Sequence, residues 1–367
     1  MKKLRISIAS IILALSLTGC ATVANASGNV SAEQGGSQVI SDVEELSVTD
    51  KDKDTSYDRS EAEIITFTDS TGTVRITDAG TYIITGSTND GMVIVETGED
   101  DDVHLVLSDV SITSSTSAAI YIISCDETYI TLEGNNTLAN GGAYKAIDDS
   151  DIDSVIYSKD DLTINGSGSL NITSPAGHAI VCKDDMVITG GTYNLTAEAD
   201  GINTNNSLAV TDGSFTITVN DDAIHTDGLL QIDGGTFNIT GAEGLEGTYV
   251  LINDGDIMIS ASDDGINAGQ KSDAYTPTIE INGGNIKISM GQGDTDGIDS
   301  NGNIVINGGT VDITGMSAFD YDGTAQFGGG KLIINGVETD SIPNQMMGGG
   351  RGNMPGNFRN GNRGQMW

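Results

Sequence analysis

The fold is decided by residues 208–247, which read LAVTDGSFTITVNDDAIHTDG over 208–228 and LLQIDGGTFNITGAEGLEG over 229–247. The two lines match when Gly213 is aligned with Gly235. Apolar residues stand five and three positions before each glycine, and again two and four positions after it. Apolar side chains at every second position lie on one face of a β-strand and leave polar side chains on the other. Each line therefore predicts two short strands joined at a glycine corner.

The same unit recurs at intervals of roughly 22 residues along most of the chain. The glycines stand at positions 168, 191, 213, 235, 255, 284, 309 and 330. A third short segment adds one apolar anchor per repeat: Ile156, Ile180, Ile202, Ile224, Leu245, Ile266, Ile298 and Phe319. Three strands and three bends in that length are one coil of a right-handed parallel β-helix. One coil cannot bury its own apolar face, so the coils must stack. We predict an all-β solenoid of roughly ten to twelve coils, spaced about 4.8 Å apart.

The N-terminus predicts export. Residues 2–5 carry three basic side chains, an apolar run over 6–17 follows, and the run ends in Leu17-Thr18-Gly19-Cys20. The run is too short to span a bilayer and is typical of a secretory signal. The ending resembles a lipobox, in which Cys20 is lipidated and becomes the first mature residue; ordinary cleavage near residues 24–26 is the alternative. We therefore expect an extracellular protein that is lipid-anchored to the bacterial cell surface.

Composition divides the chain into four parts. Residues 1–19 are the expected signal peptide, and residues 20–62, rich in Ser, Ala, Gly and acidic residues, are expected to form a flexible tether. Residues 63–340 are the expected β-helix. Residues 341–367 are Gly, Asn, Met and Arg, which predicts a disordered tail. Cys125 and Cys182 are too few for a disulfide scaffold, and the sequence leaves their pairing open.

The chain is strongly acidic, with 53 Asp and Glu against 16 Lys and Arg and a formal net charge of −37. Such a body does not bind nucleic acid or an anionic membrane through its own charge, so membrane contact is expected only through the lipid. The charge favours cation binding instead. The three histidines lack zinc spacing and are expected at the surface.

Acidic residues follow the repeat beside the third segment. They stand two positions before the anchors and one position after them, in register from coil to coil. Like charges about 5 Å apart repel by roughly 1 kcal/mol in water, and by more in a lower dielectric. Calcium accepts 6–8 oxygen ligands in flexible geometry and would relieve that repulsion. The alternative is a solvated acidic edge, since Asp and Asn also favour turns. The predicted calcium ligands are Asp200, Asp222, Glu243, Glu246, Asp264, Asp296, Asp299 and Asp320.

Aromatic residues divide into core and surface candidates. The column Tyr193, Phe215 and Phe237 alternates with Leu and Ile, so we assign it to the core. Outward tyrosines are expected at 157, 249, 275 and 321. An insertion over 267–278 carries Lys271 and Tyr275, and insertions in solenoids often emerge on the binding face. The predicted polysaccharide-binding residues are Lys271, Tyr275 and Tyr321.

Four short stretches carry a family resemblance. They are Asp78-Ala-Gly-Thr-Tyr-Ile-Ile-Thr-Gly86, Ser158-Lys-Asp-Asp-Leu-Thr-Ile-Asn-Gly166, Asp296-Gly-Ile-Asp-Ser-Asn-Gly302 and Ala318-Phe-Asp-Tyr-Asp-Gly323. In this order they resemble a bacterial extracellular carbohydrate-binding domain family whose β-helix is similar to that of pectate lyases. The resemblance covers roughly residues 64–340. It implies bound calcium and binding of plant cell-wall polysaccharides, including acidic galacturonan and cellulose-like chains.

Three functions remain open from the sequence. The leading hypothesis is a non-catalytic, calcium-dependent polysaccharide-binding lipoprotein. The second is a polysaccharide lyase, which needs calcium to acidify the C5 proton of a uronate and a base to remove it. No arginine stands between Thr81 and Asp340, so a lyase would use a lysine, with Lys183 or Lys271 as candidates. The third is a structural or adhesive surface spacer.

Overall fold

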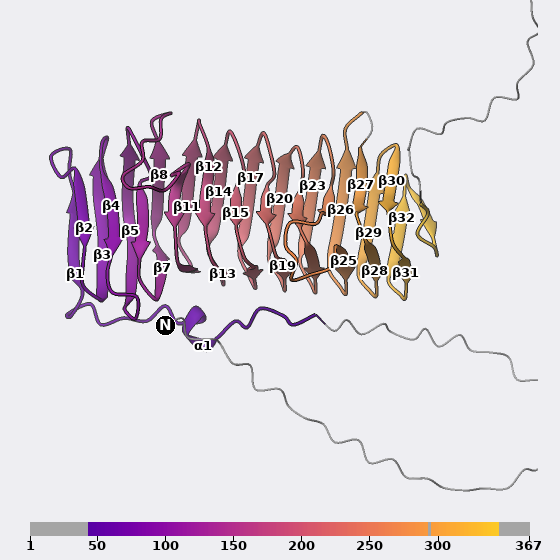
Figure 1. Ribbon diagram of the computed structural model, residues 1–367, viewed down its shortest axis with the longest axis horizontal. Coiled ribbons are helices and arrows are strands. Elements are labelled where there is room, and N and C mark those ends of the chain that lie inside the picture. Colours follow the sequence, from indigo (N-terminus) through magenta and orange to yellow (C-terminus); the bar gives the residue numbers. More distant parts are fainter. Residues whose placement is uncertain (1–42, 293–294, 345–367) are drawn as a thin grey trace, which may run out of the picture.

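The computed structural model describes residues 43–292 and 295–344. These residues form a rod of stacked parallel coils with almost no helix, which confirms the predicted β-solenoid (Figure 1). The expected signal peptide, Cys20, the first half of the expected tether and nearly all of the tail lie outside the described residues. Within the described residues, no helix is long and apolar enough to cross a membrane.

Three stacks of parallel strands make the walls of the rod, and we name them by their place in the coil. Stack A precedes the glycine corner: β7 (Glu127–Glu133), β10 (Asp161–Gly166), β13 (Met186–Ile188), β16 (Leu208–Val210), β19 (Leu229–Ile232), β22 (Tyr249–Ile252), β25 (Thr278–Ile281), β28 (Asn303–Ile306) and β31 (Ala325–Phe327). Stack B follows it: β8 (Asn135–Asn140), β11 (Ser169–Ser174), β14 (Thr192–Ala197), β17 (Ser214–Val219), β20 (Thr236–Gly241), β23 (Asp256–Ala261), β26 (Asn285–Met290), β29 (Thr310–Thr314) and β32 (Lys331–Ile334).

Stack C contains the third strand of each coil. Its eleven members are β2 (Thr73–Ile76), β4 (Met92–Glu96), β6 (Ile120–Ser124), β9 (Ser154–Ser158), β12 (His178–Cys182), β15 (Ile202–Thr204), β18 (Ile224–Thr226), β21 (Leu245–Gly247), β24 (Ile266–Ala268), β27 (Asp296–Ser300) and β30 (Ser317–Tyr321). The first coils use β1 (Glu63–Phe67) and two longer strands, β3 (Gly80–Thr88) and β5 (Asp102–Ser114). Strand β5 pairs with both β7 and β8, so it spans the positions of stacks A and B. An antiparallel strand, β33 (Val337–Thr339), follows β32.

Identical positions of successive coils stack inside the rod. Tyr193 lies over Phe215 and Phe215 over Phe237, with ring centroids 4.6 Å apart and planes within 4° of parallel. All three are buried, which confirms their assignment to the core. In the last coil Ala325 and Phe327 are only partly buried, because no further coil covers them.

Residues 43–58 lie along the outside of the rod, so the prediction of a flexible tether is wrong for this part (Figure 1). We call these residues the strap. Val43 and Leu46 contact the apolar outer surface of β19 and β22, and the Leu46 amide donates to Gln231 Oε1 at 2.9 Å. A single helical turn, α1 (Asp50–Lys53), follows; its N-cap is Thr49. These contacts hold the strap against the rod, although its composition is typical of a flexible linker.

Two of the expected outward tyrosines are covered. Tyr157 packs against Tyr121 and Val181 beneath Ile152 of the loop over 141–153. Tyr249 lies under the strap and Tyr275. Both side chains do point away from the central core, but segments that follow no repeat cover them.

Candidate metal centre

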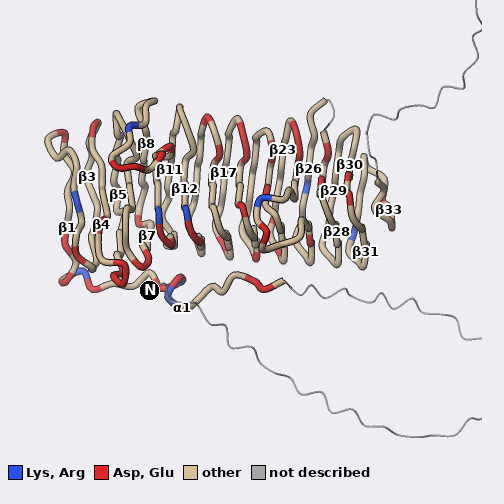
Figure 2. The backbone as a smooth tube through the Cα atoms, viewed as in Figure 1, with Lys and Arg blue, Asp and Glu red and all other residues tan. Residues whose placement is uncertain are grey.

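The predicted register of the acidic residues is confirmed on stack C. Backbone pairing aligns the positions before the anchors, since the amides of Gly201, Ala223, Gly244 and Gly265 each donate to the carbonyl of the next coil's acid. The positions after the anchors pair directly, from Asn203 opposite His225 to Asp299 opposite Asp320. We call these two columns the acidic ladder. Figure 2 shows how far acidic residues outnumber basic ones along the rod.

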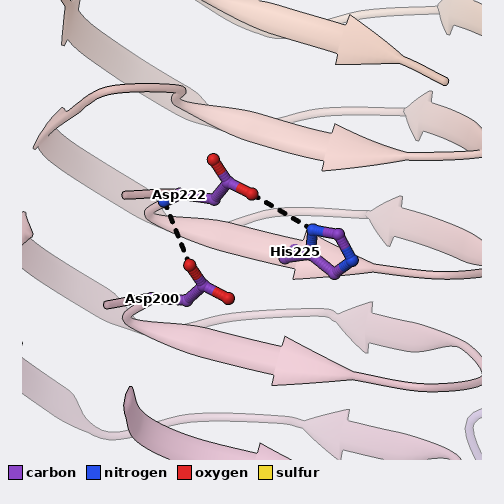
Figure 3. A group of neighbouring side chains, drawn as sticks. All are labelled: Asp200, Asp222 and His225. Atoms are coloured by element: carbon purple, nitrogen blue, oxygen red, sulfur yellow. Dashed lines mark hydrogen bonds and ion pairs between the residues drawn. The ribbon is translucent and has the colours of Figure 1, made fainter. Parts of the chain in front are cut away.

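The lower part of the ladder is built around histidines. Asp200 Oδ2 accepts from Asn203 at 2.7 Å and lies 3.1 Å from His178 Nδ1. Asp200 Oδ1 accepts the backbone amide of Asp222, and the Asp222 carboxylate lies 3.1 Å from His225 Nδ1 (Figure 3). Asp200, Asp222 and His225 each offer a ligand atom, all within 4.8 Å of one another.

In the middle of the ladder His225 and Lys271 neutralise Glu246. His225 Nδ1 lies 2.5 Å from Glu246 Oε2, and Lys271 Nζ lies 2.8 Å from Glu246 Oε1. Burial opposes the charge on His225, but the carboxylates of Asp222 and Glu246 outweigh it and raise the pKa of His225 to about 10. The imidazolium is therefore the cation of this rung. Asp222, Glu243 and Glu246 form a second group whose ligand atoms lie within 4.8 Å.

In the upper part of the ladder, no described lysine, arginine or histidine forms an ion pair with Asp264, Asp299 or Asp320. Burial and the carboxylates of Asp264, Asp296, Asp320 and Asp322 together raise the pKa of Asp299 to about 7. No lysine or histidine is among the described groups that shift it. Burial and neighbouring acids likewise raise the pKa of Asp264 to about 6. Asp320 Oδ1 is buried and accepts no hydrogen bond from the described residues.

These residues fit a hard divalent cation. A buried carboxylate oxygen without a donor is costly, and ionised carboxylates in close array repel unless a positive charge lies between them. Carboxylate and amide oxygens from successive coils are the ligand set that calcium prefers. In the upper rung, which consists of Asp264, Asp296, Asp299 and Asp320, the carboxylates of Asp264, Asp299 and Asp320 form no ion pair with a described lysine, arginine or histidine. The described groups whose ligand atoms lie within 4.8 Å of one another are in the lower and middle parts of the ladder and at the bend between stacks C and A. At the middle rung a metal would compete with His225 and Lys271.

The predicted polysaccharide-binding residues lie at different places. Lys271 and Tyr275 are together on the insertion, where Lys271 pairs with the ladder and Tyr275 contacts Tyr249 edge-on, with centroids 6.2 Å apart. Tyr321 ends β30 and is partly buried against the last coils. Lys183 lies over the ring of Tyr157, 5.6 Å from its centroid.

The predicted surface positions of His178 and His225 are wrong, and one acidic group was not predicted from the sequence. His178 and His225 are mostly buried in the ladder, where we had expected surface positions. The carboxylates of Asp161, Asp184 and Asp185 also gather within 4.8 Å, at the bend between stacks C and A. Two adjacent Asp pairs, one coil apart, were the available signal.

Comparison with known proteins identifies the family of this chain. A family model described as carbohydrate-binding domain-containing protein matches residues 70–246 and 230–329. A protein with that description from Acetivibrio thermocellus is 35% identical over 195 residues, which are 52% of this chain and 63% of the relative, so the match spans less than two thirds of that protein. A solved structure, described as the polysaccharide lyase-like protein from C. thermocellum, gadolinium derivative, is 26% identical with a TM-score of 0.44 and covers 75% of this chain and 94% of that one. The family model matches well over half of the sequence, and the chain belongs to the carbohydrate-binding domain-containing protein family.

Proposed function

We propose that this carbohydrate-binding protein is non-catalytic and binds polysaccharide in a calcium-dependent way. The observation that carries the proposal is Asp299 in the upper rung, which lies among carboxylates and forms no ion pair with a described lysine, arginine or histidine. Calcium would be held there by Asp264, Asp296, Asp299 and Asp320. A second ion would be held by Asp222, Glu243 and Glu246, with Asp200 one coil away.

The ligand we propose is a plant cell-wall-type polysaccharide, acidic galacturonan or a cellulose-like chain. A formal net charge of −37 repels a polyanion, so galacturonan requires calcium as a bridge or a local cation such as Lys271. Tyr275 beside it, and Tyr321 farther along the rod, would contact sugar rings. The described surface offers few exposed aromatic side chains, so binding to neutral glucans should be weaker.

Sedimentation with insoluble polygalacturonate tests the proposal. We expect retention in calcium, loss in chelator, and a smaller change for neutral soluble glucans. The variants Lys271→Ala and Tyr275→Ala should weaken retention without unfolding the rod, since both residues lie on the insertion outside the coils; a melt of each variant measures the stability lost with the Glu246 and Tyr249 contacts. Lys287→Ala, on the outer surface of stack B, is the matched control and should bind as wild type. Equal retention in calcium and chelator would refute the bridging mechanism.

The lyase alternative requires an unprotonated lysine near bound uronate. Burial opposes the charge on Lys271, but Glu246 at 2.8 Å outweighs it and raises the pKa of Lys271. A base needs the opposite shift, which disfavours Lys271 and leaves Lys183. Release of unsaturated uronides, followed by ultraviolet absorbance, would establish lyase activity, and its absence with intact binding would support the non-catalytic function.

We also propose that the protein is extracellular and held to the membrane by lipid on Cys20. Fatty-acid labelling in the native bacterium should mark the wild type and fail to mark Cys20→Ala. Labelling of both forms, or of neither, would contradict the anchor.

A further inference from the structure

A cavity of about 270 Å³ is lined by residues of the strap and of β3, β5 and β7. Figure 1 shows these strands at the end of the rod away from β27 and β30 of the ladder's upper rung. The volume of the cavity equals the liquid volume of roughly nine water molecules, which suits a single sugar ring. One wall comes from the strap and the others from β3, β5 and β7. The residues that define its chemistry are Lys51, Asp54, Thr81, Asp102, His104 and Tyr129.

A chain of hydrogen bonds fixes which nitrogen of His104 carries the proton. Asn165 Nδ2 donates to the strap carbonyls of Asp52 and Asp54 at 3.1 and 3.2 Å, so Asn165 Oδ1 faces Thr131. Thr131 uses its only hydroxyl proton to donate to Asn165 Oδ1 at 2.6 Å. At 2.7 Å from His104 Nε2, Thr131 can then only accept, so Nε2 carries the hydrogen.

Nδ1 of His104 is consequently an acceptor. Burial lowers the pKa of His104, which keeps the ring neutral and the lone pair on Nδ1 available. The strap determines this state, because Asn165 is oriented by the two strap carbonyls. A ligand that hydrogen-bonds to this nitrogen must bring a donor.

The other polar groups of the cavity are also mostly acceptors. Asp54 Oδ1 accepts from the amide and hydroxyl of Ser56, while no described residue donates to Oδ2. Lys51 is the cation of the cavity; its Nζ pairs with Asp102 Oδ2 at 2.7 Å and lies 4.5 Å from the centroid of the Tyr129 ring. Two carboxylates against one ammonium disfavour an anionic ligand. A neutral molecule with several hydroxyl donors fits.

We propose that this cavity is a second carbohydrate subsite, which binds one neutral sugar ring, free or at the end of a glycan chain. The sugar hydroxyls donate to His104 Nδ1 and Asp54 Oδ2, and Lys51 donates to a sugar oxygen. The inference rests on the carbohydrate-binding function, but it requires neither calcium nor the ladder. It differs from the ladder in ligand class, since a uronate is disfavoured here.

Nitrogen-15 spectra of the histidine rings test the subsite on the full chain, which has three histidines. In the free protein we expect the Nε2–H tautomer for His104. D-Glucose, D-galactose and D-xylose are titrated separately, and at least one should shift the His104 Nδ1 resonance saturably, in calcium and in chelator alike. D-Galacturonate is the anionic comparison and should not shift it.

A matched pair of variants separates recognition from strap folding. Asp54→Ala removes the proposed acceptor, and a lost hydrogen bond to a charged group should weaken the sugar by about tenfold or more. Asp58→Ala is the control, because Asp58 closes the same kind of turn with Ser60, at 2.8 and 2.6 Å, and does not line the cavity. The control should bind the sugar as wild type.

Three results would overturn the subsite: no neutral sugar shifts His104, galacturonate shifts it equally, or the two variants lose binding equally. Polygalacturonate retention on the same samples reports the ladder separately. Loss of that retention with an intact His104 response would refute the calcium-dependent function and leave the subsite standing.

Discussion

At the scale of single residues, the glycine corners decide whether a coil can close. Gly213 and Gly235 have φ of +134° and +99°, a region that side chains rarely adopt. A Cβ at Gly213 would lie 2.8 Å from the Phe215 ring, and one at Gly235 would lie 3.0 Å from the Gly213 carbonyl oxygen. The sequence identified these positions correctly because the corner recurs with the repeat.

We predict that Gly213→Val and Gly235→Val each destabilise the protein. Backbone strain of this kind costs of order 1–3 kcal/mol. Thermal melts followed by circular dichroism should show lower midpoints for both. Ser214→Val, the next residue on the exposed face of β17, is the control; melts indistinguishable from wild type for both glycine variants would show that the corners tolerate a side chain.

Replacing Asp299 with Asn should raise the melting temperature in chelator and reduce the stabilisation that calcium gives. Asp299→Asn removes a charge from a cluster of carboxylates, so in chelator the variant should melt above wild type. The same change removes a calcium ligand. Wild type should gain about 2.7 kcal/mol at a hundredfold excess of calcium over Kd, or roughly 5 °C in melting temperature, and the variant should lose most of that gain.

The control for Asp299 is Asp256→Asn, an exposed acid on β23 of stack B. It should change neither the chelator midpoint nor the calcium response. A variant Asp299→Asn that melts below wild type in chelator would mean that its carboxylate is stabilising without metal, and the upper rung would need another explanation.

At the scale of elements, sequence reasoning succeeded where the repeat operates and failed where it stops. The apolar alternation predicted the three stacks, and the spacing of the acids predicted the register of the ladder. The strap was missed because Val43 and Leu46 are isolated apolar residues in a polar segment. Their partners, such as Gln231 and Tyr249, lie far away in sequence, so no local pattern marks the contact.

Asn165→Ala should release the strap and leave the coils intact. Asn165 is buried and donates to two strap carbonyls, and each lost bond costs about 1 kcal/mol. Hydrogen exchange of residues 43–58 should accelerate while that of stack B stays unchanged. Asn171→Ala, which loses a bond to the Asn136 carbonyl on stack B, is the control. Unchanged exchange of the strap in Asn165→Ala would show that its apolar end alone holds it.

The chemistry of the ladder was only partly predictable at this scale. The acids could be named from their spacing, but not the cations that neutralise them. His225 occupies a ladder position, yet of its three carboxylate partners Asp222 and Asp227 come from its own coil and Glu246 comes from the next one. Lys271 reaches Glu246 from an insertion whose path no repeat dictates. The acids of the ladder that pair with a cation can therefore be identified only from the three-dimensional structure.

At the scale of the whole molecule, the ladder should make stability depend on pH when no divalent cation is bound. Burial and neighbouring acids raise the pKa of Glu243 to about 8, of Asp264 to about 6 and of Asp299 to about 7. Between pH 5 and 8 the folded state then holds more protons than the unfolded state, so stability falls as pH rises. His225, with its raised pKa, acts in the same direction above pH 6.5, its ordinary value.

Melting temperatures in chelator should therefore decrease steadily from pH 5 to pH 9. Calcium should flatten the curve at the alkaline end, where it replaces the protons. A parallel series in calcium is the control. Midpoints in chelator that rise across this range would contradict the raised pKa values of the ladder acids.

The contacts of the strap also imply an order of folding steps during synthesis of the chain. Residues 43–58 emerge before every strand of the rod during synthesis, but the amide of Leu46 donates to Gln231, 185 residues later in the sequence. Its apolar end cannot settle until β19 and β22 have formed, whereas its α1 end needs only the coils near Asn165. Closing so long a loop costs conformational entropy, and contacts with β19 and β22 can offset that cost only after these strands have folded. The strap thus precedes every strand of the rod in the sequence but completes its contacts only after β22 has formed, and its docking marks a rod whose coils are complete up to β22.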